Sequence, residues 1–274
     1  MKVVLFCGGQ GMRLREFSER IPKPMVPIGY RPILWYIMKY YAHYGFKDFV
    51  LCLGYQGDVI KNYFVNYNEY TSNDFVYAKG GNYVNLINKD IDDWTITFAD
   101  TGINATLGER LLAVQKYLEG EEYFLANYSD ALTDLPLDEM VANFESQKKT
   151  GMFMVTQPTR SFHVVKLNED NKSVNEITTL ANSGMWVNAG YFIFNKSIFN
   201  YLHPGEDLVD DALPRLLKEN ELGVHTYNGT WIPMDTFKEK QMLDDMYAKG
   251  DTPWEVWKKK PVKTVDKASA KVSA

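Results

Sequence analysis

The order of strands and helices in the first quarter of the chain limits the fold more than any other feature. Residues 2–7 (KVVLFC) are a short apolar run that stops at glycine, which predicts a buried strand. Residues 31–45 carry apolar side chains at helical spacing, 48–55 form a second apolar run, and 57–68 fit a short helix. This order is typical of parallel strands joined by helices, so it predicts an α/β fold with a mainly parallel sheet.

Proline and glycine mark the ends of the helix expected over 31–45. Pro32 suits its first turn, where a missing N–H costs nothing, and Gly45 suits its C-terminal cap. Pro214 is expected to kink or divide a later helix. Residues 69–100 are less clear until the alternating stretch WTITFADTG. The other predicted elements are strands over 122–132, 152–158, 186–195 and 229–236, helices over 109–119, 138–151, 207–220 and 238–250, and hairpins within 159–185.

No internal repeat and no sharp change in composition divides the chain. Residues 1–257 are therefore expected to form a single domain. Residues 258–274 are rich in Lys, Ala and Ser, have no aromatic side chain and show little periodicity, so we expect a disordered tail.

The composition excludes several classes of function. The 274 residues are 45% hydrophobic and 24% charged, which is ordinary for a globular protein. A net charge of −5 argues against a nucleic-acid partner, because a large nucleic-acid footprint needs a basic surface. No apolar stretch approaches the roughly 18 residues that cross a bilayer, and the first is too short for a signal peptide. We expect no membrane association and a cytoplasmic location.

Cysteine and histidine do not suggest metal or nucleophile chemistry. Cys7 and Cys52 lie in apolar runs and are expected to be buried free thiols. Two cysteines form neither a disulfide framework nor a zinc site. The four histidines lack metal-ligand spacing, and no nucleophile elbow is present, which argues against a hydrolase.

Three glycines directly follow the first predicted strand, at Gly8, Gly9 and Gly11. Glycine lets backbone N–H groups approach anionic oxygens, so a strand, a glycine turn and a cation can cradle a phosphate. The spacing matches neither G-x-x-x-x-G-K-[ST] nor G-x-G-x-x-G. On these residues alone, a tight turn and an anion site are equally good interpretations.

Lys23 stands between two prolines, which stiffen the backbone on either side of it. A solvated surface lysine is one interpretation. A cation held rigidly in place is the other, and Arg13, ten residues earlier, favours it.

Two aspartates follow extended stretches. Asp130 comes just after the apolar strand FLA, at the end where open α/β sheets bind ligands, although aspartate also forms turns there. Asp235 lies in IPMDT, 105 positions later. Two such carboxylates could share one Mg²⁺ with phosphate oxygens, but their spacing does not show that they meet.

Several stretches together resemble the sugar-1-phosphate nucleotidylyltransferases, over roughly residues 1–257. The DTG and GERL motifs and the final TPWEVW are similar to the cytidylyltransferase branch of that family. The stretches are GGQGMRL (8–14), PKPMVPIG (22–29), RPILWYIMKYY (31–41), KDFVLCLGYQGDVIKNYF (47–64), ADTGINATLGERL (99–111), YSD (128–130), VNAGYF (187–192), WIPMDT (231–236) and TPWEVW (252–257).

The resemblance implies a fold and a reaction. The fold is a Rossmann-like, mostly parallel mixed sheet flanked by helices, with a small β-rich sugar-binding subregion. The reaction is Mg²⁺-dependent nucleotidyl transfer from CTP to a sugar 1-phosphate, which gives a CDP-sugar and pyrophosphate. The resemblance also implies a homo-oligomer.

The same resemblance implies roles for single residues. Arg13 and Lys23 are the implied catalytic residues: Arg13 holds the departing pyrophosphate, and Lys23 neutralises the α-phosphate. Asp130 and Asp235 carry Mg²⁺, while Asn188 and Gly190 face the sugar. The remaining implied nucleotide contacts are the loop residues Gly8, Gly9 and Gly11 and the base-pocket residues Thr101, Gly102, Gly108 and Arg110.

Two departures from the family pattern concern the ligands. Met12 occupies a position where the family has Thr or Ser, so one phosphate hydrogen bond is lost. The family also has a Glu-Lys-Pro stretch whose lysine grips the sugar phosphate, but residues 174–184 (VNEITTLANSG) contain no lysine. Either the acceptor differs from glucose 1-phosphate or another cation, such as Arg160 or Lys166, replaces that lysine.

Two alternatives therefore stay open beside CTP-dependent transfer. The first is the same chemistry with UTP or dTTP, or with another phosphorylated acceptor. The second is a regulatory protein that binds nucleotide sugars without turnover. The absent lysine favours that alternative, whereas Arg13, Lys23, Asp130 and Asp235 oppose it.

Overall fold

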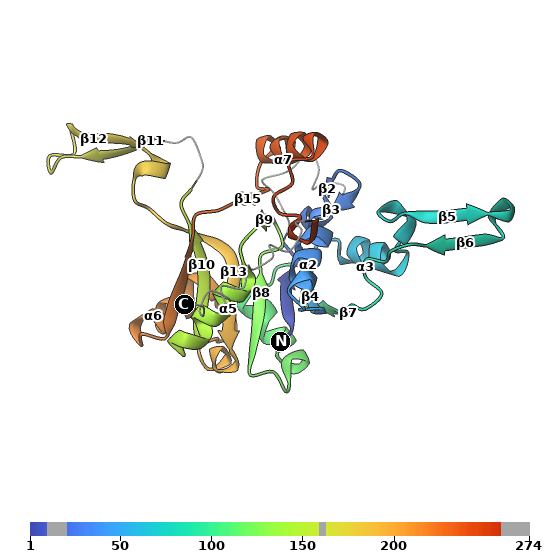
Figure 1. Cartoon of the computed structure of the whole chain (residues 1–274). Helices are drawn as coiled ribbons and strands as arrows, with labels where there is room; N and C mark the ends of the chain where they lie inside the picture. The colour runs from blue at the N-terminus through green and yellow to red at the C-terminus, as the bar shows by residue number, and fades with distance from the viewer. Residues whose placement is uncertain (10–20, 159–162, 259–274) are drawn as a thin grey trace, which may run out of the picture.

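A mixed sheet forms the centre of the molecule (Figure 1). The computed structural model describes residues 1–9, 21–158 and 163–258. Within these residues the central sheet has seven strands, in the order β14-β10-β13-β8-β1-β4-β7. They are β1 (Val3–Phe6), β4 (Asp48–Leu53), β7 (Thr95–Asp100), β8 (Tyr123–Asn127), β10 (Gly151–Thr156), β13 (Val187–Asn195) and β14 (Leu222–Tyr227).

The sheet is mostly parallel, as predicted. Strand β1 pairs in parallel with β4 and β8, β4 with β7, and β10 with β14. Strand β13 is antiparallel to both of its neighbours, β8 and β10. The α/β fold with a mixed sheet is therefore confirmed, and β14 is an additional strand that the sequence pattern did not reveal.

Helices cover both faces of the sheet. One apolar cluster contains Val3 and Leu5 of β1, and a second contains Val4 and Phe6, so alternate side chains of one strand enter different cores. The α-helices are α2 (Ile33–His43), α3 (Gly57–Val65), α4 (Leu107–Val114), α5 (Leu137–Gln147), α6 (Leu213–Lys218) and α7 (Phe237–Lys249). The short turns are η2 (Lys23–Met25), η3 (Glu69–Thr71), η4 (Lys79–Gly81), η5 (Gln115–Leu118), η6 (Leu180–Asn182), η7 (Lys196–Asn200), η8 (Leu208–Ala212) and η9 (Val256–Lys258).

Proline and glycine act near their predicted positions. Helix α2 begins at Ile33, with Pro32 as its N-cap rather than inside its first turn. Gly45 has a φ of +87° just beyond the C-cap residue Tyr44, a conformation that favours glycine. Pro214 lies in the first turn of α6, directly after the π-helical turn η8. The backbone stays helical across this junction, so the helix changes from π to α there without being interrupted.

Four pairs of short strands lie outside the central sheet. Figure 1 shows that two of them, β5–β6 and β11–β12, form hairpins that project from the body in opposite directions. Gly80 and Gly81, both with positive φ, form the β5–β6 turn, which the sequence analysis left unassigned. The pairs are β2 (Pro27–Ile28) with β3 (Arg31–Pro32), β5 (Phe75–Ala78) with β6 (Tyr83–Leu86), β9 (Ala131–Thr133) with β15 (Trp231–Pro233), and β11 (His163–Leu167) with β12 (Val174–Thr179).

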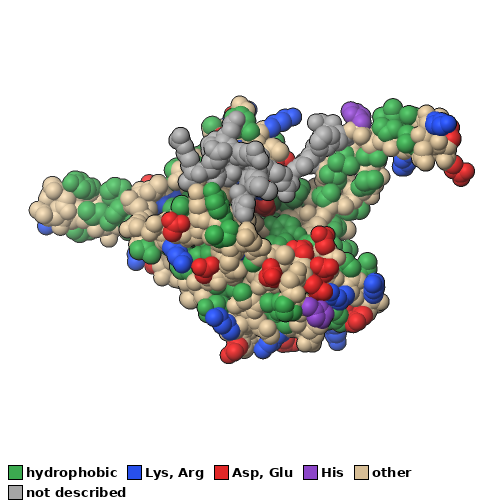
Figure 2. All heavy atoms as spheres, turned by 180° about the vertical axis from the view of Figure 1, so that it is seen from behind, with side chains coloured by type: hydrophobic (Ala, Val, Ile, Leu, Met, Phe, Trp, Pro, Cys, Tyr) green, Lys and Arg blue, Asp and Glu red, His purple; other side chains and the backbone are tan. Residues whose placement is uncertain are grey.

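Both projecting hairpins expose apolar side chains, and Figure 2 shows hydrophobic atoms along each arm. On β5–β6 these include Tyr77, which is 65% exposed, and Tyr83. On β11–β12 they include Ile177, which is 63% exposed. A two-stranded hairpin gains little stability from itself, so each depends on how its base is attached to the body.

A buried arginine anchors the segment that carries β5–β6. Arg31 is only 2% exposed and hydrogen-bonds Ser72, Tyr63 and the Asn68 carbonyl. Its guanidinium also lies 3.7 Å from a carboxylate oxygen of Asp90. These contacts tie both ends of the excursion between α3 and β7 to the body.

Both apolar clusters pack on the same sheet, which supports the prediction of one domain over residues 1–257. That boundary stays a prediction. Most of the tail expected to be disordered, 259–274, lies outside the described residues. Within the residues that are described, no helix is both long and apolar enough to span a membrane. Cys7 and Cys52 are buried free thiols, as expected, and burial raises the pKa of Cys7 to about 12.

Candidate functional site

Most of the predicted site residues lie at one edge of the central sheet. Parallel strands bring their carboxyl ends together, and ligands of open α/β sheets bind there. Gly8 follows β1, Thr101 and Gly102 follow β7, and Asp130 follows β8 after a two-residue turn. Strand order therefore places residues from distant parts of the sequence at one edge.

The backbone around Lys23 is held rigidly. Lys23 begins the single turn η2, in which the Met25 N–H donates to the Pro22 carbonyl and the Val26 N–H to the Lys23 carbonyl. Pro24 and Met25 are buried, which fixes this turn to the core. The side chain of Lys23 is 13% exposed. The rigid placement expected from the flanking prolines is therefore present.

A short antiparallel pair brings Asp130 and Asp235 together. Strand β9 follows Asp130 and β15 precedes Asp235, and Ala131 is paired with Pro233. The Met234 N–H donates to the Asp130 carbonyl at 2.8 Å, which extends the pairing toward the two aspartates. A separation of 105 positions in the sequence thus becomes a contact in space.

The ammonium of Lys23 lies between the two carboxylates. Its Nζ is 2.7 Å from Asp130 Oδ2 and 2.7 Å from Asp235 Oδ1. Burial alone would lower the pKa of Lys23, but the two carboxylates outweigh burial and raise it. Lys23 is therefore a cation throughout the neutral range.

The same geometry fits a divalent metal ion. Two carboxylate oxygens that contact one nitrogen are close enough to share one cation, and Mg²⁺ is usually bound by one or two carboxylates with phosphate oxygens and water. Among the described residues, no group of three or more His, Cys, Asp or Glu side chains could hold a metal without such additional ligands. The pair therefore suits a metal that arrives with a phosphate ligand.

An unusual backbone conformation precedes Asp130. Ser129 is fully buried and has a φ of +65°, which a residue with a side chain rarely adopts. Its N–H donates to Asn127 Oδ1 at 2.7 Å, which stabilises this turn. The Cys7 thiol lies 3.5 Å from Ser129 Oγ, so the end of β1 touches the turn that positions Asp130.

Arg110 joins the ends of three strands. It lies on α4, is 3% exposed, and donates to acceptors that follow or end β1, β4 and β7. Burial lowers its pKa. The acceptors are Thr101 Oγ1 (2.7 Å) and the carbonyls of Gly8 (3.0 Å), Leu53 (3.4 Å), Gly102 (2.9 Å) and Ile103 (3.3 Å).

Two glycines leave the space that this guanidinium fills. A Cβ on Gly8 would lie 2.0 Å from Arg110 Nη1, so the guanidinium would have to leave its position. A Cβ on Gly54 would lie 2.7 Å from the carbonyl oxygens of both Gly8 and Gly102. Glycine at these two positions therefore allows the observed packing around Arg110.

The other residues predicted to line a base pocket also have contacts within the protein. Thr101 Oγ1 donates to the Leu53 carbonyl at 2.8 Å. Gly102 has a φ of +93°, and its N–H donates to Asp100. A Cβ on Gly108 would lie 2.5 Å from the Glu206 carbonyl, so this glycine lets α4 pack closely. Their contact with a base stays a prediction.

The residues predicted to face a sugar pack around Tyr128. Asn188 donates from Nδ2 to the Tyr128 hydroxyl at 3.1 Å and accepts the Gly190 N–H at 2.9 Å. Gly190 has a φ of +78°, and a Cβ there would lie 2.4 Å from the Tyr128 ring. The three residues form one unit beside the Asp130 turn.

Several predicted residues lie outside the described part of the chain, namely Gly11, Met12, Arg13 and Arg160. Lys166 lies on the projecting β11–β12 hairpin. Its Nζ is 2.7 Å from Glu176 of the paired strand, and it is 53% exposed.

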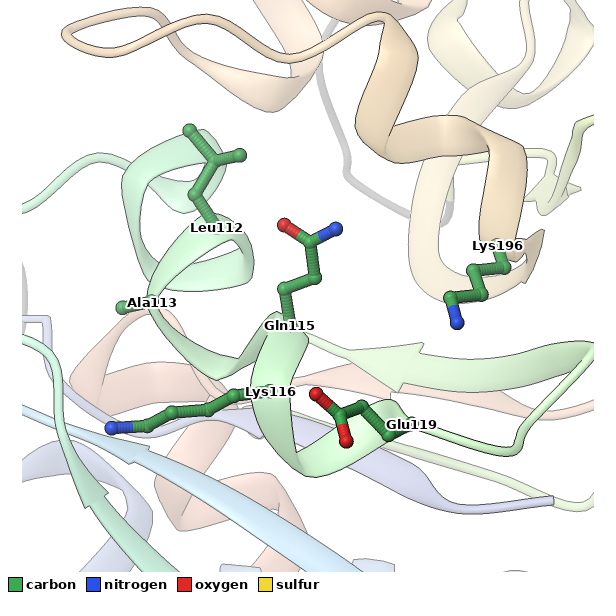
Figure 3. Close-up of a pocket in the computed structure, with 6 residues that line it drawn as sticks. All are labelled: Leu112, Ala113, Gln115, Lys116, Glu119 and Lys196. Carbon is green, nitrogen blue, oxygen red and sulfur yellow. The ribbon is translucent and has the colours of Figure 1, made fainter.

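A separate pocket of about 330 Å³ lies where the last turn of α4 continues into η5 (Figure 3). Lys196 follows β13, and its N–H donates to Glu122 just before β8 begins. The pocket therefore lies at the amino ends of the parallel strands, away from Asp130. Its lining residues are Leu112, Ala113, Gln115, Lys116, Glu119 and Lys196.

Sequence reasoning missed Gly54 and Tyr128. Gly54 could have been found, because it ends a buried strand just as Gly8 does, and Phe6 and Cys52 are paired in the sheet. Tyr128 carried no such signal, because its role depends on Asn188 of a strand distant in sequence.

Comparison with known proteins identifies the family. Residues 2–244 match the model of the family described as "Nucleotidyl transferase", which covers most of the chain. The chain belongs to the nucleotidyl transferase family. Over 259 residues it is 34% identical to "Glucose-1-phosphate cytidylyltransferase" of Salmonella typhimurium, covering 94% of this chain and all of that protein. A protein named "Probable glucose-1-phosphate cytidylyltransferase" of Bacillus subtilis is 32% identical over the same shares.

Solved structures of nucleotidyltransferases share the fold. A UDP-glucose pyrophosphorylase complexed with UDP-glucose superposes with a TM-score of 0.66 at 17% identity, covering 91% of this chain and 99% of that one. The protein is thus a nucleotidyltransferase with the fold that the sequence predicted, and its relatives include cytidylyltransferases.

Proposed function

We propose that this nucleotidyltransferase transfers a nucleotidyl group, preferably from CTP, to a sugar 1-phosphate with the help of Mg²⁺. The observation that carries the proposal is the contact of Lys23 with both Asp130 and Asp235 at the carboxyl edge of the sheet. The relatives named as glucose-1-phosphate cytidylyltransferases support CTP as the donor and glucose 1-phosphate as the first acceptor to test.

The reaction needs charge neutralisation more than a base. A sugar phosphate is already an anionic nucleophile, and its oxygen attacks the α-phosphorus of the triphosphate. The bond between the α-phosphorus and the bridging oxygen breaks, and pyrophosphate leaves with that oxygen. Two anions must meet, so fixed positive charge is the main requirement.

Lys23, Asp130 and Asp235 would meet that requirement together. Mg²⁺ held by the two carboxylates would neutralise phosphate charge. Lys23, rigid in η2, places an ammonium beside the same carboxylates. By the family resemblance, that ammonium would neutralise the α-phosphate. Arg13, by the family resemblance, would hold the departing pyrophosphate.

Pyrophosphate release tests the proposal directly. The full chain is incubated with each of CTP, UTP, dTTP, ATP and GTP and a panel of sugar 1-phosphates, with Mg²⁺ and with EDTA. We expect the fastest release with CTP and none with EDTA. Faster release with another nucleotide, or release in EDTA, would contradict the corresponding part of the proposal.

A second candidate is a protein that binds nucleotide sugars without turnover. It is favoured by the absence of lysine from 174–184 and by the pairing of Lys166 with Glu176 on an exposed hairpin. Tight nucleotide binding with no pyrophosphate release from any pair would establish this candidate instead.

A further inference from the structure

We propose that Arg110 is a positioning residue that aims the backbone N–H groups of Gly9 and Ile103 at the bound nucleotide. The proposal rests on the proposed function only in taking that ligand to be a nucleotide. Arg110 would act through the backbone, because its guanidinium is buried and bonded to the protein.

Two backbone carbonyl groups accept hydrogen bonds from the Arg110 guanidinium. Arg110 Nη2 donates to the Gly8 carbonyl at 3.0 Å, and the Tyr55 N–H donates to the same oxygen at 3.2 Å. Arg110 Nη1 donates to the Gly102 carbonyl at 2.9 Å. Both carbonyls therefore point inward, toward one guanidinium.

The direction of each carbonyl fixes the direction of the N–H group of the residue that follows it. In a planar trans peptide the C=O of one residue and the N–H of the following residue point in opposite directions. The described residues contain no cis peptide bond. Holding the carbonyls of Gly8 and Gly102 inward thus directs the N–H groups of Gly9 and Ile103 outward.

These two N–H groups are placed to meet a ligand. Gly9 is exposed, and Ile103 is 55% exposed. Neither N–H donates a hydrogen bond to another residue in the described part of the chain. Both follow carboxyl ends of parallel strands, where nucleotides bind in this kind of sheet.

The packing around Arg110 shows independently that the arrangement is tight. A Cβ on Gly54 would collide with the carbonyl oxygens of both Gly8 and Gly102 and would lie 2.9 Å from Arg110 Nη1. The two carbonyls therefore converge on one point. Even one added methyl group would push them apart.

The charge of Arg110 also favours an anion at this edge. All five of its hydrogen-bond acceptors are neutral, and the carboxylates of Glu109 and Asp100 act on it through electrostatic attraction without a hydrogen bond. A cation held in this way beneath outward N–H groups stabilises negative charge in front of them.

Nucleotide binding by variants tests the proposal. Arg110→Met removes the charge and the donors, whereas Arg110→Lys keeps the charge but loses the planar fork. Arg215→Met is the matched control, because Arg215 also joins a carbonyl (Tyr201) and a side chain (Glu206), but on α6. We expect the Kd for CTP to rise about 10- to 100-fold in both Arg110 variants. The KM for the acceptor should stay unchanged in the Arg110 variants. The CTP affinity of Arg215→Met should equal that of the wild type.

A backbone signal separates positioning from a general loss of structure. In protein labelled with ¹⁵N-glycine, CTP should shift the Gly9 amide resonance, which is assigned as the signal missing from Gly9→Ala. A Cβ on Gly9 meets no atom of the described residues within 4 Å, so this variant should fold. Thermal unfolding is used to check that Arg110→Lys is folded. In this variant the CTP-induced shift of the Gly9 resonance should be lost.

Three results would overturn the proposal. They are unchanged CTP affinity in a folded Arg110 variant, an equal loss in Arg215→Met, and a retained Gly9 shift in Arg110→Lys. Because binding is measured without turnover, an absence of pyrophosphate release by the wild-type protein would count against the proposed function alone.

Discussion

Two cations with little solvent exposure lie at the same edge of the sheet, but their partners differ in kind. Lys23 contacts two carboxylates, Asp130 and Asp235, whereas Arg110 contacts neutral oxygens, mostly backbone carbonyls. A cation paired with carboxylates belongs to a set of charges that a metal and phosphates can rearrange. A cation bonded to carbonyls instead fixes the course of the backbone.

The comparison separates two tasks within one site. In the proposed reaction the Lys23 cluster supplies the charges, so its variants should lose turnover more than stability. The Arg110 cluster is proposed to shape the loop around the nucleotide, so its variants should lose stability and nucleotide affinity. The predictions below test that separation, beginning with the largest expected effect.

Removing either carboxylate should have the largest effect on turnover. Asp130→Ala or Asp235→Ala takes away half of the pair that fits Mg²⁺ and leaves Lys23 with one partner. We expect a loss of at least about 1000-fold in kcat. Steady-state kinetics over a range of Mg²⁺ concentrations measure it, with the exposed Asp92→Ala as control. Full turnover in either variant would remove that aspartate from the metal site.

Replacing Lys23 should reduce turnover and strengthen metal binding. Lys23→Met removes the ammonium that lies between the carboxylates, so kcat should fall about 100-fold. The same change removes one cation that competes with a metal for both carboxylates, so Mn²⁺ should bind the nucleotide-free variant more tightly than the wild type. Calorimetry measures this, with exposed Lys47→Met as control. Weaker Mn²⁺ binding would show that Lys23 does not compete for this pair.

The two cations should differ most clearly in stability. Arg110→Met removes five hydrogen bonds from the middle of this cluster and places an apolar side chain among their acceptors, so the free energy of unfolding should fall by about 3 kcal/mol. Lys23→Met leaves two partly exposed carboxylates that water can reach, and should cost less. Urea unfolding of both variants measures the difference. A larger loss in Lys23→Met would reverse the division of tasks proposed here.

A further cation, the buried Arg31, contacts both neutral groups and the carboxylate of Asp90. The protonation of Asp90 makes the stability of this cluster depend on pH, which sharpens the comparison. Burial would raise the pKa of Asp90, but hydrogen bonds from Ser72 and Lys39 outweigh burial and lower it below 3.8. A lowered pKa in the folded state stabilises the fold above about pH 4, and this stability is lost as the pH falls further.

Asp90→Asn should therefore flatten the stability curve at low pH. At pH 7 we expect the free energy of unfolding to fall by about 2 kcal/mol. Between pH 4 and pH 3 the variant should lose less stability than the wild type. Thermal unfolding across this range checks the prediction, and parallel curves for the two proteins would contradict it.

Lys166 should show the smallest effect. It pairs with Glu176 on an exposed hairpin, and surface pairs of this kind contribute little. We expect Lys166→Ala to leave kcat and the acceptor KM within about twofold of the wild type. A large rise in the acceptor KM would instead make Lys166 the substitute for the missing family lysine.

Much of the fold could be predicted from local patterns. Val3–Phe6 and Asp48–Leu53 are apolar runs bounded by turn residues, and such runs identify buried parallel strands. Strand β14 was missed because Leu222–Tyr227 mixes exposed and partly buried residues and follows directly on a helix. Local spacing carried too little information there.

The site was harder to predict, because its contacts join distant segments. Lys23 could be recognised as rigid from its flanking prolines, and Asp130 from its place after a strand. The meeting of Asp130 with Asp235 depends on the pairing of β9 with β15, which no local pattern reveals. Only the family resemblance indicated that pair. The clamp of Arg110 on backbone carbonyls could not be foreseen, because those acceptors have no side-chain signature.

The pairing of β9 with β15 also sets the order in which the site is assembled during synthesis. A ribosome makes Lys23 and Asp130 early, but Asp235 follows only when most of the chain has been translated. A nascent chain can therefore fold its first strands and present a single aspartate beside Lys23. The second carboxylate, and with it the complete proposed metal site, is added only when the most recently made part of the chain folds back onto an earlier part.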